Sequence, residues 1–285
     1  MSFASMTRRV KLSDLVPPDV GSQLPRELFL NLLQTSLTRL RSTARQLADF
    51  TFPPQCALCG CVDFSADGRG VAYCPDCIAE LCPAPLNRCE CCGADIGPYA
   101  KSDGGCTHCR NRTLRFDSVV CLGMYDESLK QALLSAKWSF SAVRMRSLGA
   151  LLAVERLTAL KELRCDRIVP IPQHWRQRLV RHFNPAWIIA AELSKQLRIP
   201  CDVHLLKRSR RARPQKRVSV GQRFENQSQA FRLRDAHVVR GQRLLIVDDV
   251  LTTGATCSEA AKLLKQSGAK SCHVAVLARV LDHSA

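Results

Sequence analysis

The sequence predicts an α/β fold in which a parallel β-sheet carries helices on both faces and is preceded by a small cysteine-rich module. From about Phe116 onward, apolar runs of strand length alternate with amphipathic stretches, which is typical of one α/β domain. Before that point, eleven of the 16 cysteines lie between Cys56 and Cys109, in a stretch without sustained apolar periodicity. We therefore expect an extension over residues 1–49, a metal-binding module over 50–112 and the α/β domain over 116–285.

The composition is that of a soluble globular protein with a basic surface. Of its 285 residues, 46% are hydrophobic and 24% are charged, and 42 Lys+Arg against 25 Asp+Glu give a formal charge of +17. No window holds 18 consecutive apolar residues, and the first twenty residues lack the apolar segment of a secretory signal. We expect a cytoplasmic protein without a membrane span, in which cysteines serve as metal ligands rather than in disulfides.

One amphipathic helix is expected in the N-terminal extension. Leucines recur at helical spacing from Leu28 to Leu40, and the prolines at Pro53 and Pro54 end any helix. The arginines on the outer face also suit a membrane-surface anchor. We favour docking of the apolar stripe on the protein itself, because that is the commoner use of such a stripe.

Four strands and two helices are predicted in the α/β domain. The strands cover Ser118–Met124, Arg167–Ile171, Arg243–Asp248 and His273–Ala278. The last two are continuous apolar runs, as expected of buried parallel strands. The helices cover Pro185–Arg198 and Ser258–Gln266, and Gly268 stops the second.

The cysteine-rich module contains four C-x-x-C pairs. They are Cys56/Cys59, Cys74/Cys77, Cys89/Cys92 and Cys106/Cys109. Gaps of 14 and 13 residues separate the members of successive couples, close to the spacing of tetrahedral zinc sites. We expect two closed, structural zinc sites, paired sequentially or in a crossed order, with iron as the rival metal. Cys61, Cys82 and Cys91 are then spares, and His108 is an alternative ligand.

The residue types expected of a ligand-binding site are concentrated between Leu244 and Thr256, in the stretch LLIVDDVLTTGAT. A buried strand brings Asp248 and Asp249 to the end of the sheet where α/β proteins bind ligands. The loop after them leads directly into a helix, so its backbone N–H groups suit a phosphate, and its glycine allows close approach. The expected phosphate ligands are Thr252, Thr253, Gly254, Ala255 and Thr256. The two carboxylates suit ribose hydroxyls, bound directly or through Mg²⁺.

Other ligand-site classes fit this stretch less well. A response-regulator receiver also places two aspartates after a strand, but there the pair opens the domain, whereas only 36 residues follow Asp249. The sequence has no Walker A, H-E-x-x-H or G-x-S-x-G motif, so NTPase, metalloprotease and α/β-hydrolase sites lack their anchors.

Leu244–Thr256 resembles the phosphoribosyl pyrophosphate (PRPP) motif of type I phosphoribosyltransferases. The order of the cysteine module, the stretch Ile168–Asn184, the basic stretch Leu205–Phe231 and this motif resembles the ComF family, over about Phe50 to Val280. The resemblance implies a type I phosphoribosyltransferase-like sheet. It also implies a Mg²⁺-dependent PRPP site with Asp248 and Asp249 as its catalytic residues.

The resemblance also assigns residues in two further segments. Arg176, Arg178 and Arg181 match the pyrophosphate-side loop, and Phe183 and Asn184 match its ending, where His182 replaces a family glycine. In the basic segment the family matches are Gln215, Ser219, Arg223 and Asn226. Lys137 matches a lysine that precedes an aromatic residue.

Excess positive charge gathers between Arg164 and Arg223, where 15 Lys+Arg and 3 Asp+Glu give +12. A track for a polyanion such as single-stranded DNA explains this surplus better than pyrophosphate alone, although a solvated loop is the simpler interpretation. The resemblance implies a role in natural competence, with single-stranded DNA and other DNA-uptake proteins as partners. The alternative is a stand-alone phosphoribosyltransferase, a pentosyl transferase of nucleotide or related metabolism.

Overall fold

The structure, a computed structural model, describes residues 55–62, 70–83, 87–97, 99, 105–138, 142–173, 183–209 and 230–281. Pro54–Ala285 forms one compact unit. The helix expected between Leu28 and Leu40 lies outside the described residues.

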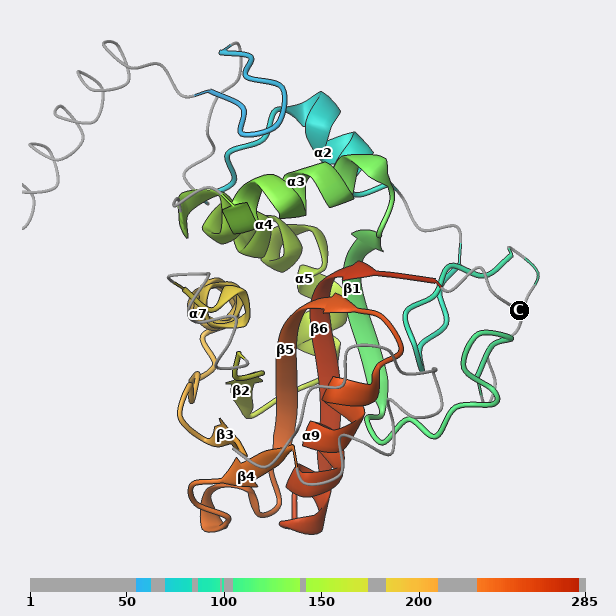
Figure 1. Cartoon of the computed structure of the whole chain (residues 1–285), viewed down its shortest axis with the longest axis vertical. Coiled ribbons are helices and arrows are strands. Elements are labelled where there is room, and N and C mark those ends of the chain that lie inside the picture. Colours follow the sequence, from blue (N-terminus) through green and yellow to red (C-terminus); the bar gives the residue numbers. More distant parts are fainter. Residues whose placement is uncertain are drawn as a thin grey trace, which may run out of the picture. The chain divides into compact units, whose positions relative to one another are not determined.

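A parallel four-stranded sheet forms the centre of the compact unit, with strand order β1-β6-β5-β2 (Figure 1). Its strands are β1 (Ser118–Met124), β2 (Arg167–Pro170), β5 (Arg243–Leu251) and β6 (Ser271–Arg279). All four predicted strands are confirmed, but β5 and β6 are longer than expected because they pair with each other as far as Leu251 and Arg279. A short antiparallel hairpin of β3 (Leu206–Arg208) and β4 (Phe231–Leu233) was not predicted.

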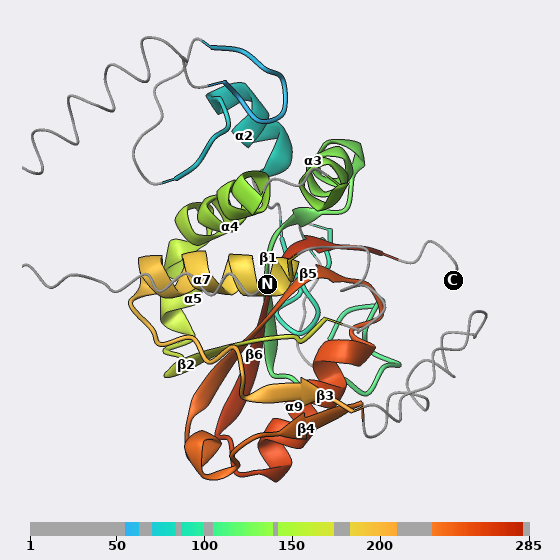
Figure 2. The same ribbon diagram turned by 60° about the vertical axis from the view of Figure 1, so that its left-hand side comes forward.

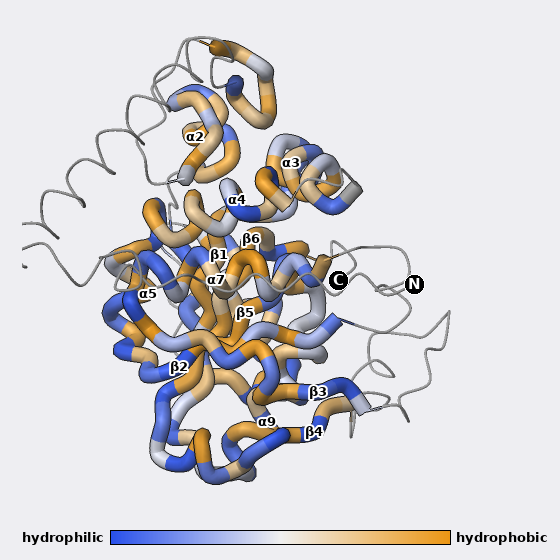
Figure 3. The backbone as a smooth tube through the Cα atoms, turned by 90° about the vertical axis from the view of Figure 1, so that its left-hand side faces the viewer, coloured by the Kyte–Doolittle hydropathy of each residue, from blue (hydrophilic) through white to orange (hydrophobic). Residues whose placement is uncertain are grey.

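Alternating side chains of β5 reach the two faces of the sheet, and each face has its own core. Leu244 and Ile246 belong to the core shared with α9 (Ala255–Gln266). Leu245 and Val247 belong to the opposite core, with α4 (Ala142–Glu155) and α7 (Pro185–Leu197). Figure 2 shows these helices on opposite sides of the sheet, and Figure 3 shows the hydrophobic strands between them. Burial on both faces explains why β5 and β6 are continuous apolar runs.

The starts of α7 and α9 follow from local chemistry. Pro185 is the first residue of α7, where proline is favoured. Asn184 is a favoured N-cap residue, and its side chain accepts a hydrogen bond from the Ala186 N–H. Helix α9 begins at Ala255, three residues before the predicted start. Gly254 adopts a left-handed conformation with φ of 80° and lets the chain turn directly from the sheet into the helix.

Part of the cysteine-rich segment shares a core with the helices beside the sheet. Cys56, Tyr73 and Leu81, the last residue of α2 (Pro75–Leu81), are buried in the same cluster as Leu129 and Met145. Residues 127–138 form α3 (Glu127–Trp138), which contributes Leu129. The first cysteine segment is therefore packed onto the α/β fold.

Two short elements complete the described structure, α5 (Leu157–Glu162) and the 3-10 helix η2 (His237–Val239). Within the described ranges, no helix has the length and apolar character needed to cross a membrane.

Candidate ligand site and metal centres

A polar cavity of about 250 Å³ opens at the carboxyl end of the sheet. Its lining comes from α3, the end of β2, the start of α7, β3, β5 and α9. The lining side chains with ionisable or amide groups are Lys137, Gln173, Asn184, Arg208, Asp248 and Asp249. A smaller hollow, formed by Asp248 and the residues from Val250 to Cys257, shares Asp248 and Thr256 with it. The acidic pair and the predicted phosphate loop are thus neighbours.

The acidic pair lies inside β5 rather than at its end, which corrects the predicted strand boundary. Asp248 pairs with Val276 of β6, and pairing continues to Leu251 because β6 itself extends to Arg279. The Asp248 carboxylate accepts a hydrogen bond from the Asp249 N–H at 2.9 Å. The rigid ladder therefore fixes the backbone under both carboxyl groups.

Burial and the adjacent carboxylate control the protonation of Asp248. Desolvation, and then the charge of Asp249, raise the pKa of Asp248 from 3.8 to about 8. The Asp249 N–H, Lys137 and Arg208 act in the opposite direction. At neutral pH the free site therefore carries less negative charge than two carboxylates imply, and an incoming cation or hydroxyl donor favours ionisation.

Two cations face the acidic pair. Lys137 Nζ lies 2.7 Å from Asp249 Oδ2, and both side chains are largely buried. The Arg208 guanidinium donates from Nε to the Pro172 carbonyl at 3.0 Å and lies 5.3 Å from the centre of the Phe231 ring. Burial lowers the pKa of Arg208, whereas Asp248 raises it. The cavity thus combines two carboxylates with two held cations.

The loop after β5 divides the predicted phosphate ligands into different roles. Thr252 is exposed and Thr256 lines the cavity, whereas Thr253 is buried and its hydroxyl accepts a hydrogen bond from the Ala255 N–H at 3.4 Å. A Cβ at Gly254 would lie 3.2 Å from Leu114 Cδ2, a tight contact that adds to the preference for glycine set by the left-handed backbone. The N-terminus of α9 faces this hollow, as phosphate binding requires.

Gln173 and Asn184 form the opposite wall. Asn184 donates to the Ile171 carbonyl at 3.0 Å while it caps α7, so it ties the end of β2 to this helix. Gln173 is 8% exposed, and within the described residues its Nε2 has no hydrogen-bond partner. Since Gln173 lines the cavity, this amide is a candidate donor to a ligand.

The second cysteine cluster has the geometry of a zinc site. Cys89, Cys92, Cys106 and Cys109 are all buried, and their sulfur atoms lie within 4.8 Å of one another. The separations are 3.8 Å for Cys89–Cys109, 3.5 Å for Cys92–Cys106 and 3.9 Å for Cys106–Cys109. Four sulfurs at about 2.3 Å from one Zn²⁺ are roughly 3.8 Å apart in a tetrahedron. These residues therefore fit a structural zinc site in which all four coordination positions are filled by cysteine sulfurs.

The first cysteine cluster differs from the prediction in one member. The four thiols within 4.8 Å of one another are those of Cys56, Cys59, Cys61 and Cys74, so Cys61, expected to be a spare, lies in this group, whereas Cys77, a predicted ligand, does not. The tight turn after Cys59 explains this difference. Gly60 has φ of 77°, and the Cys56 N–H donates to the Cys61 carbonyl at 2.8 Å, which returns Cys61 to the cluster.

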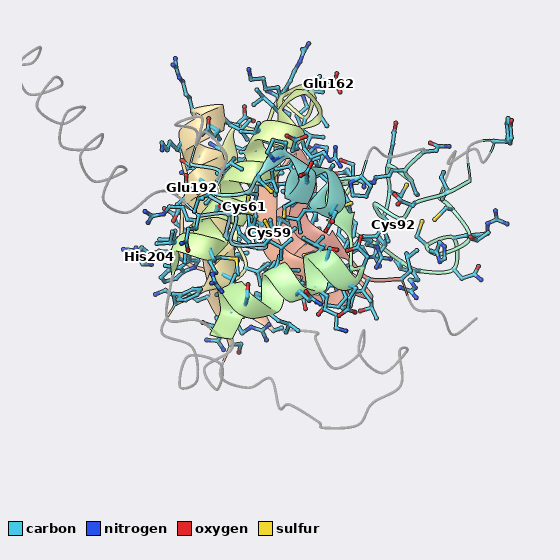
Figure 4. All side chains as sticks on the ribbon, turned by 90° about the horizontal axis from the view of Figure 1, so that it is seen from above. Cys59, Cys61, Cys92, Glu162, Glu192 and His204 are labelled. Atoms are coloured by element: carbon cyan, nitrogen blue, oxygen red, sulfur yellow. The ribbon has the colours of Figure 1, made fainter. Side chains whose placement is uncertain are left out.

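Cys77 nevertheless borders the same cluster. Burial, and then the thiols of Cys74 and Cys59, raise its pKa. By contrast, burial raises the pKa of Cys56, but hydrogen bonds from the backbone N–H groups of Cys59, Cys74 and Leu58 and from the Cys59 thiol together lower it to about 6. Figure 4 shows Cys59 and Cys61 together and Cys92 well away from them. Both four-thiol groups follow the sequential order of the knuckles rather than the crossed one.

Comparison with known proteins identifies the family. The profile described as "Phosphoribosyl transferase domain" matches residues 185–284. Competence protein F of Haemophilus influenzae is 30% identical over 210 residues, which cover 72% of this chain and 90% of that protein. The chain belongs to the ComF family. DNA utilization protein YhgH of Escherichia coli K12 is 32% identical over 200 residues, 68% of this chain and 84% of that protein.

More distant similarities to this ComF-family chain concern the phosphoribosyltransferase part. Adenine phosphoribosyltransferase of Clostridium botulinum is 33% identical over 69 residues, 24% of this chain and 40% of that protein. The solved glutamine PRPP amidotransferase of B. subtilis is similar over 48% of this chain and 26% of its own, with 21% identity and a TM-score of 0.33. The family profile over residues 185–284 and the parallel sheet together identify a phosphoribosyltransferase-type fold, preceded by cysteine clusters that suit zinc.

Several predicted ligand residues of this ComF-family protein lie outside the described residues. They are Arg176, Arg178, Arg181, Gln215, Ser219, Arg223 and Asn226. Among described residues, no sequence motif predicted a role for Gln173, and Arg208 is one of many basic residues between Arg164 and Arg223. Gln173 directly follows the Pro172 of the matched loop, which was the available signal. Nothing local distinguishes Arg208, because only the tertiary fold brings it to the acidic pair.

Proposed function

We propose that this protein binds PRPP with Mg²⁺ in the polar cavity and acts in the cytoplasm on incoming single-stranded DNA during natural competence. The observation that carries the proposal is the joint position of Asp248 and Asp249 beside the loop that opens α9. A ribose phosphate needs both elements, since carboxylates accept its hydroxyl hydrogen bonds and a helix N-terminus holds its phosphate.

Each described residue of the cavity has a role in this proposal. Asp248 and Asp249 accept hydrogen bonds from the ribose hydroxyls, and the loop amides from Thr252 onward hold the 5′-phosphate. Lys137 and Arg208 supply positive charge for the pyrophosphate end. Mg²⁺ suits the same acidic pair, because it commonly combines one or two protein carboxylates with substrate phosphate oxygens. If transfer occurs, these cations stabilise the departing pyrophosphate.

The role in DNA handling is supported by different observations. Two relatives carry the names "Competence protein F" and "DNA utilization protein YhgH". In addition, Arg164–Arg223 carries +12, more charge than a pyrophosphate group requires. A ligand cavity together with such a basic stretch of sequence suits a protein that binds both a phosphoribosyl group and a nucleic-acid strand.

Titration calorimetry with Mg²⁺-PRPP tests the cavity. The wild-type protein should bind, and Asp248→Asn together with Asp249→Asn should abolish binding while both zinc ions are retained. Single-stranded DNA binding should show a log-log salt slope of roughly −0.7 per phosphate contacted, reduced by Arg→Ala changes between Arg208 and Arg217. Full PRPP binding by the double aspartate variant would refute the proposed site.

A stand-alone phosphoribosyltransferase is the second candidate. The similarity to an adenine phosphoribosyltransferase over 69 residues favours it. It requires PRPP-dependent release of pyrophosphate in the absence of DNA, with a nucleobase as the first acceptor to test. Pyrophosphate release without DNA, with no defect of Arg208–Arg217 variants in transformation, would favour this candidate over the first.

A further inference from the structure

Arg279, the last residue of β6, is a buried cation whose hydrogen bonds within the described residues all go to carbonyl oxygens. It is 3% exposed, and its Nε donates to the Cys92 carbonyl at 2.8 Å. One terminal nitrogen lies within hydrogen-bond distance of three carbonyl oxygens, that of Leu251 at 3.1 Å and those of Thr252 and Val280, which share its two N–H groups. Among the described residues, no carboxylate forms an ion pair with it within 4.0 Å. Burying a guanidinium that has no carboxylate partner in the described part of the chain is costly, so its position requires an explanation.

These hydrogen bonds join two sites that lie far apart in the sequence. Cys92 belongs to the second cysteine cluster, whereas Leu251 and Thr252 begin the loop of the ligand site. In a planar trans peptide, the C=O and the following N–H point in opposite directions. Because Arg279 draws the carbonyls of Leu251 and Thr252 to one side, the N–H groups of Thr252 and Thr253 point to the other. Arg279 itself does not line the ligand hollow.

A second set of contacts joins the same two regions independently. Leu114 packs against the second cysteine cluster, and its Cδ2 lies 3.2 Å from the position of a Cβ at Gly254. The Ser258 hydroxyl of α9 accepts from the Arg115 N–H at 3.0 Å and donates to the Thr113 carbonyl at 3.3 Å. The chain leaving the cluster is therefore fixed against both the loop and the first turn of α9.

We propose that Arg279 is a positioning residue that couples the second cysteine cluster to the ligand loop, an inference that rests on the proposed function. A metal ion at the cluster fixes the Cys92 carbonyl, and Arg279 transmits this constraint to the loop, whose amides are then preset for a phosphate. Four thiolates around Zn²⁺ carry a net charge of −2, which also compensates the guanidinium. Metal retention and ligand binding are thus linked, and the linkage is reciprocal.

The experiment compares Arg279→Gln and Arg279→Lys with the matched control Arg88→Gln. Arg88 directly precedes Cys89 of the second cysteine cluster and likewise donates to a carbonyl oxygen of the sheet, that of Cys121 at 3.0 Å, but none of its described hydrogen bonds reaches the loop. Hydrogen exchange of the Thr252–Thr256 amides is measured in each ligand-free protein. Zinc release to a chelator is then followed with and without Mg²⁺-PRPP, and PRPP affinity is measured by calorimetry.

We expect faster amide exchange in the loop of Arg279→Gln and about tenfold weaker PRPP binding, with both zinc ions still bound. Mg²⁺-PRPP should slow release of zinc from the second cluster in wild type and in Arg88→Gln, but not in Arg279→Gln. Arg279→Lys keeps the charge but not the planar fork, so it should be intermediate. If Arg279→Gln does not fold, Arg279→Lys must show the same changes in part.

Two results would overturn the inference. One is that, in both Arg279 variants, the loop amides exchange at the wild-type rate and Mg²⁺-PRPP slows zinc release as much as in wild type. The other is equal effects in Arg279→Gln and Arg88→Gln, which would make the role merely structural. If wild type binds no PRPP but the Arg279 variants alone loosen the loop, the proposed function fails while the positioning role stands. If wild type binds PRPP and either of those two results is obtained, the inference alone fails.

Discussion

Lys137 Nζ lies 2.7 Å from Asp249 Oδ2, so the acidic pair of the ligand cavity already holds a cation of the protein. This ammonium group competes with a divalent ion for the same oxygen. Replacing Lys137 with Met should therefore tighten binding of Mn²⁺, measured without PRPP by electron paramagnetic resonance. The expected gain is roughly fivefold, because a pair of this kind contributes about 1 kcal/mol.

Lys130→Met provides the control for this prediction. Lys130 lies on the same helix, α3, but pairs with the exposed Glu127 at 3.2 Å, away from the cavity. Its replacement should leave Mn²⁺ affinity unchanged. Weaker Mn²⁺ binding by Lys137→Met than by wild type would show that the lysine does not compete at this carboxylate.

Binding of Mg²⁺-PRPP should depend on pH through Asp248. Its pKa of about 8 in the free protein means that a proton must leave when the carboxylate engages the ligand. Affinity should therefore rise by at most about tenfold per pH unit from pH 6 and level off above pH 8. Calorimetry in buffers of different ionisation enthalpy checks this by counting the protons released, and Asp248→Asn should remove the dependence from any residual binding. A pH-independent wild-type affinity would contradict it.

The raised pKa of Asp248 also predicts how stability depends on pH: the free energy of unfolding should fall as pH rises, whereas PRPP affinity should increase. The unfolded chain has an ordinary carboxyl pKa near 3.8, so between about pH 4 and 8 the folded protein holds the extra proton at Asp248. The contribution of Asp248 to the free energy of unfolding therefore falls as pH rises across this window. Urea unfolding of wild type and Asp248→Asn at pH 5.5 and 8 should show a smaller decrease in the variant. An equal decrease in both would assign the dependence to other groups.

The parts of the fold that could be predicted from the sequence are those with a period or a local stop. Strands β5 and β6 are continuous apolar runs, and Asn184 with Pro185 marks the start of α7. Helix α4 could not be predicted in this way, because its residues are buried almost continuously from Ser147 to Ala153 and show no polar face. The antiparallel pair of β3 and β4 was not predicted because each strand has three residues, too few to show an alternation of apolar and polar residues.

The candidate site divides similarly. The acidic pair and its loop are contiguous in sequence, so the strand before them and the helix after them were sufficient to predict that they lie side by side at the end of the sheet. Gln173 and Arg208 reach the cavity only through the fold. The choice between Cys61 and Cys77 depended on the turn at Gly60, which the spacing of C-x-x-C pairs does not reveal.

Cys61→Ser and Cys77→Ser should differ in their effect on the first cysteine cluster. Cys61 belongs to the four closest thiols, so its loss should cost more zinc affinity than loss of Cys77, which borders them. Competition with a chromogenic chelator measures this affinity, and zinc in the second cluster serves as the internal reference. A greater loss of zinc affinity in Cys77→Ser than in Cys61→Ser would show that Cys77 is the fourth ligand, as the sequence predicted.

Gly254→Ala should reduce stability more than Gly241→Ala, and it alone should weaken PRPP binding. Both glycines have a left-handed backbone, with φ of 80° and 73°, which costs an alanine about 1 kcal/mol. A Cβ at Gly241 meets nothing within 4 Å, whereas at Gly254 it meets Leu114 at 3.2 Å and the Phe116 ring at 3.4 Å. Overpacking adds about 1 kcal/mol or more at Gly254 and displaces the phosphate loop. Urea unfolding and calorimetry of both variants check this, and equal losses of stability with unchanged PRPP affinity would show that the loop tolerates the added methyl group.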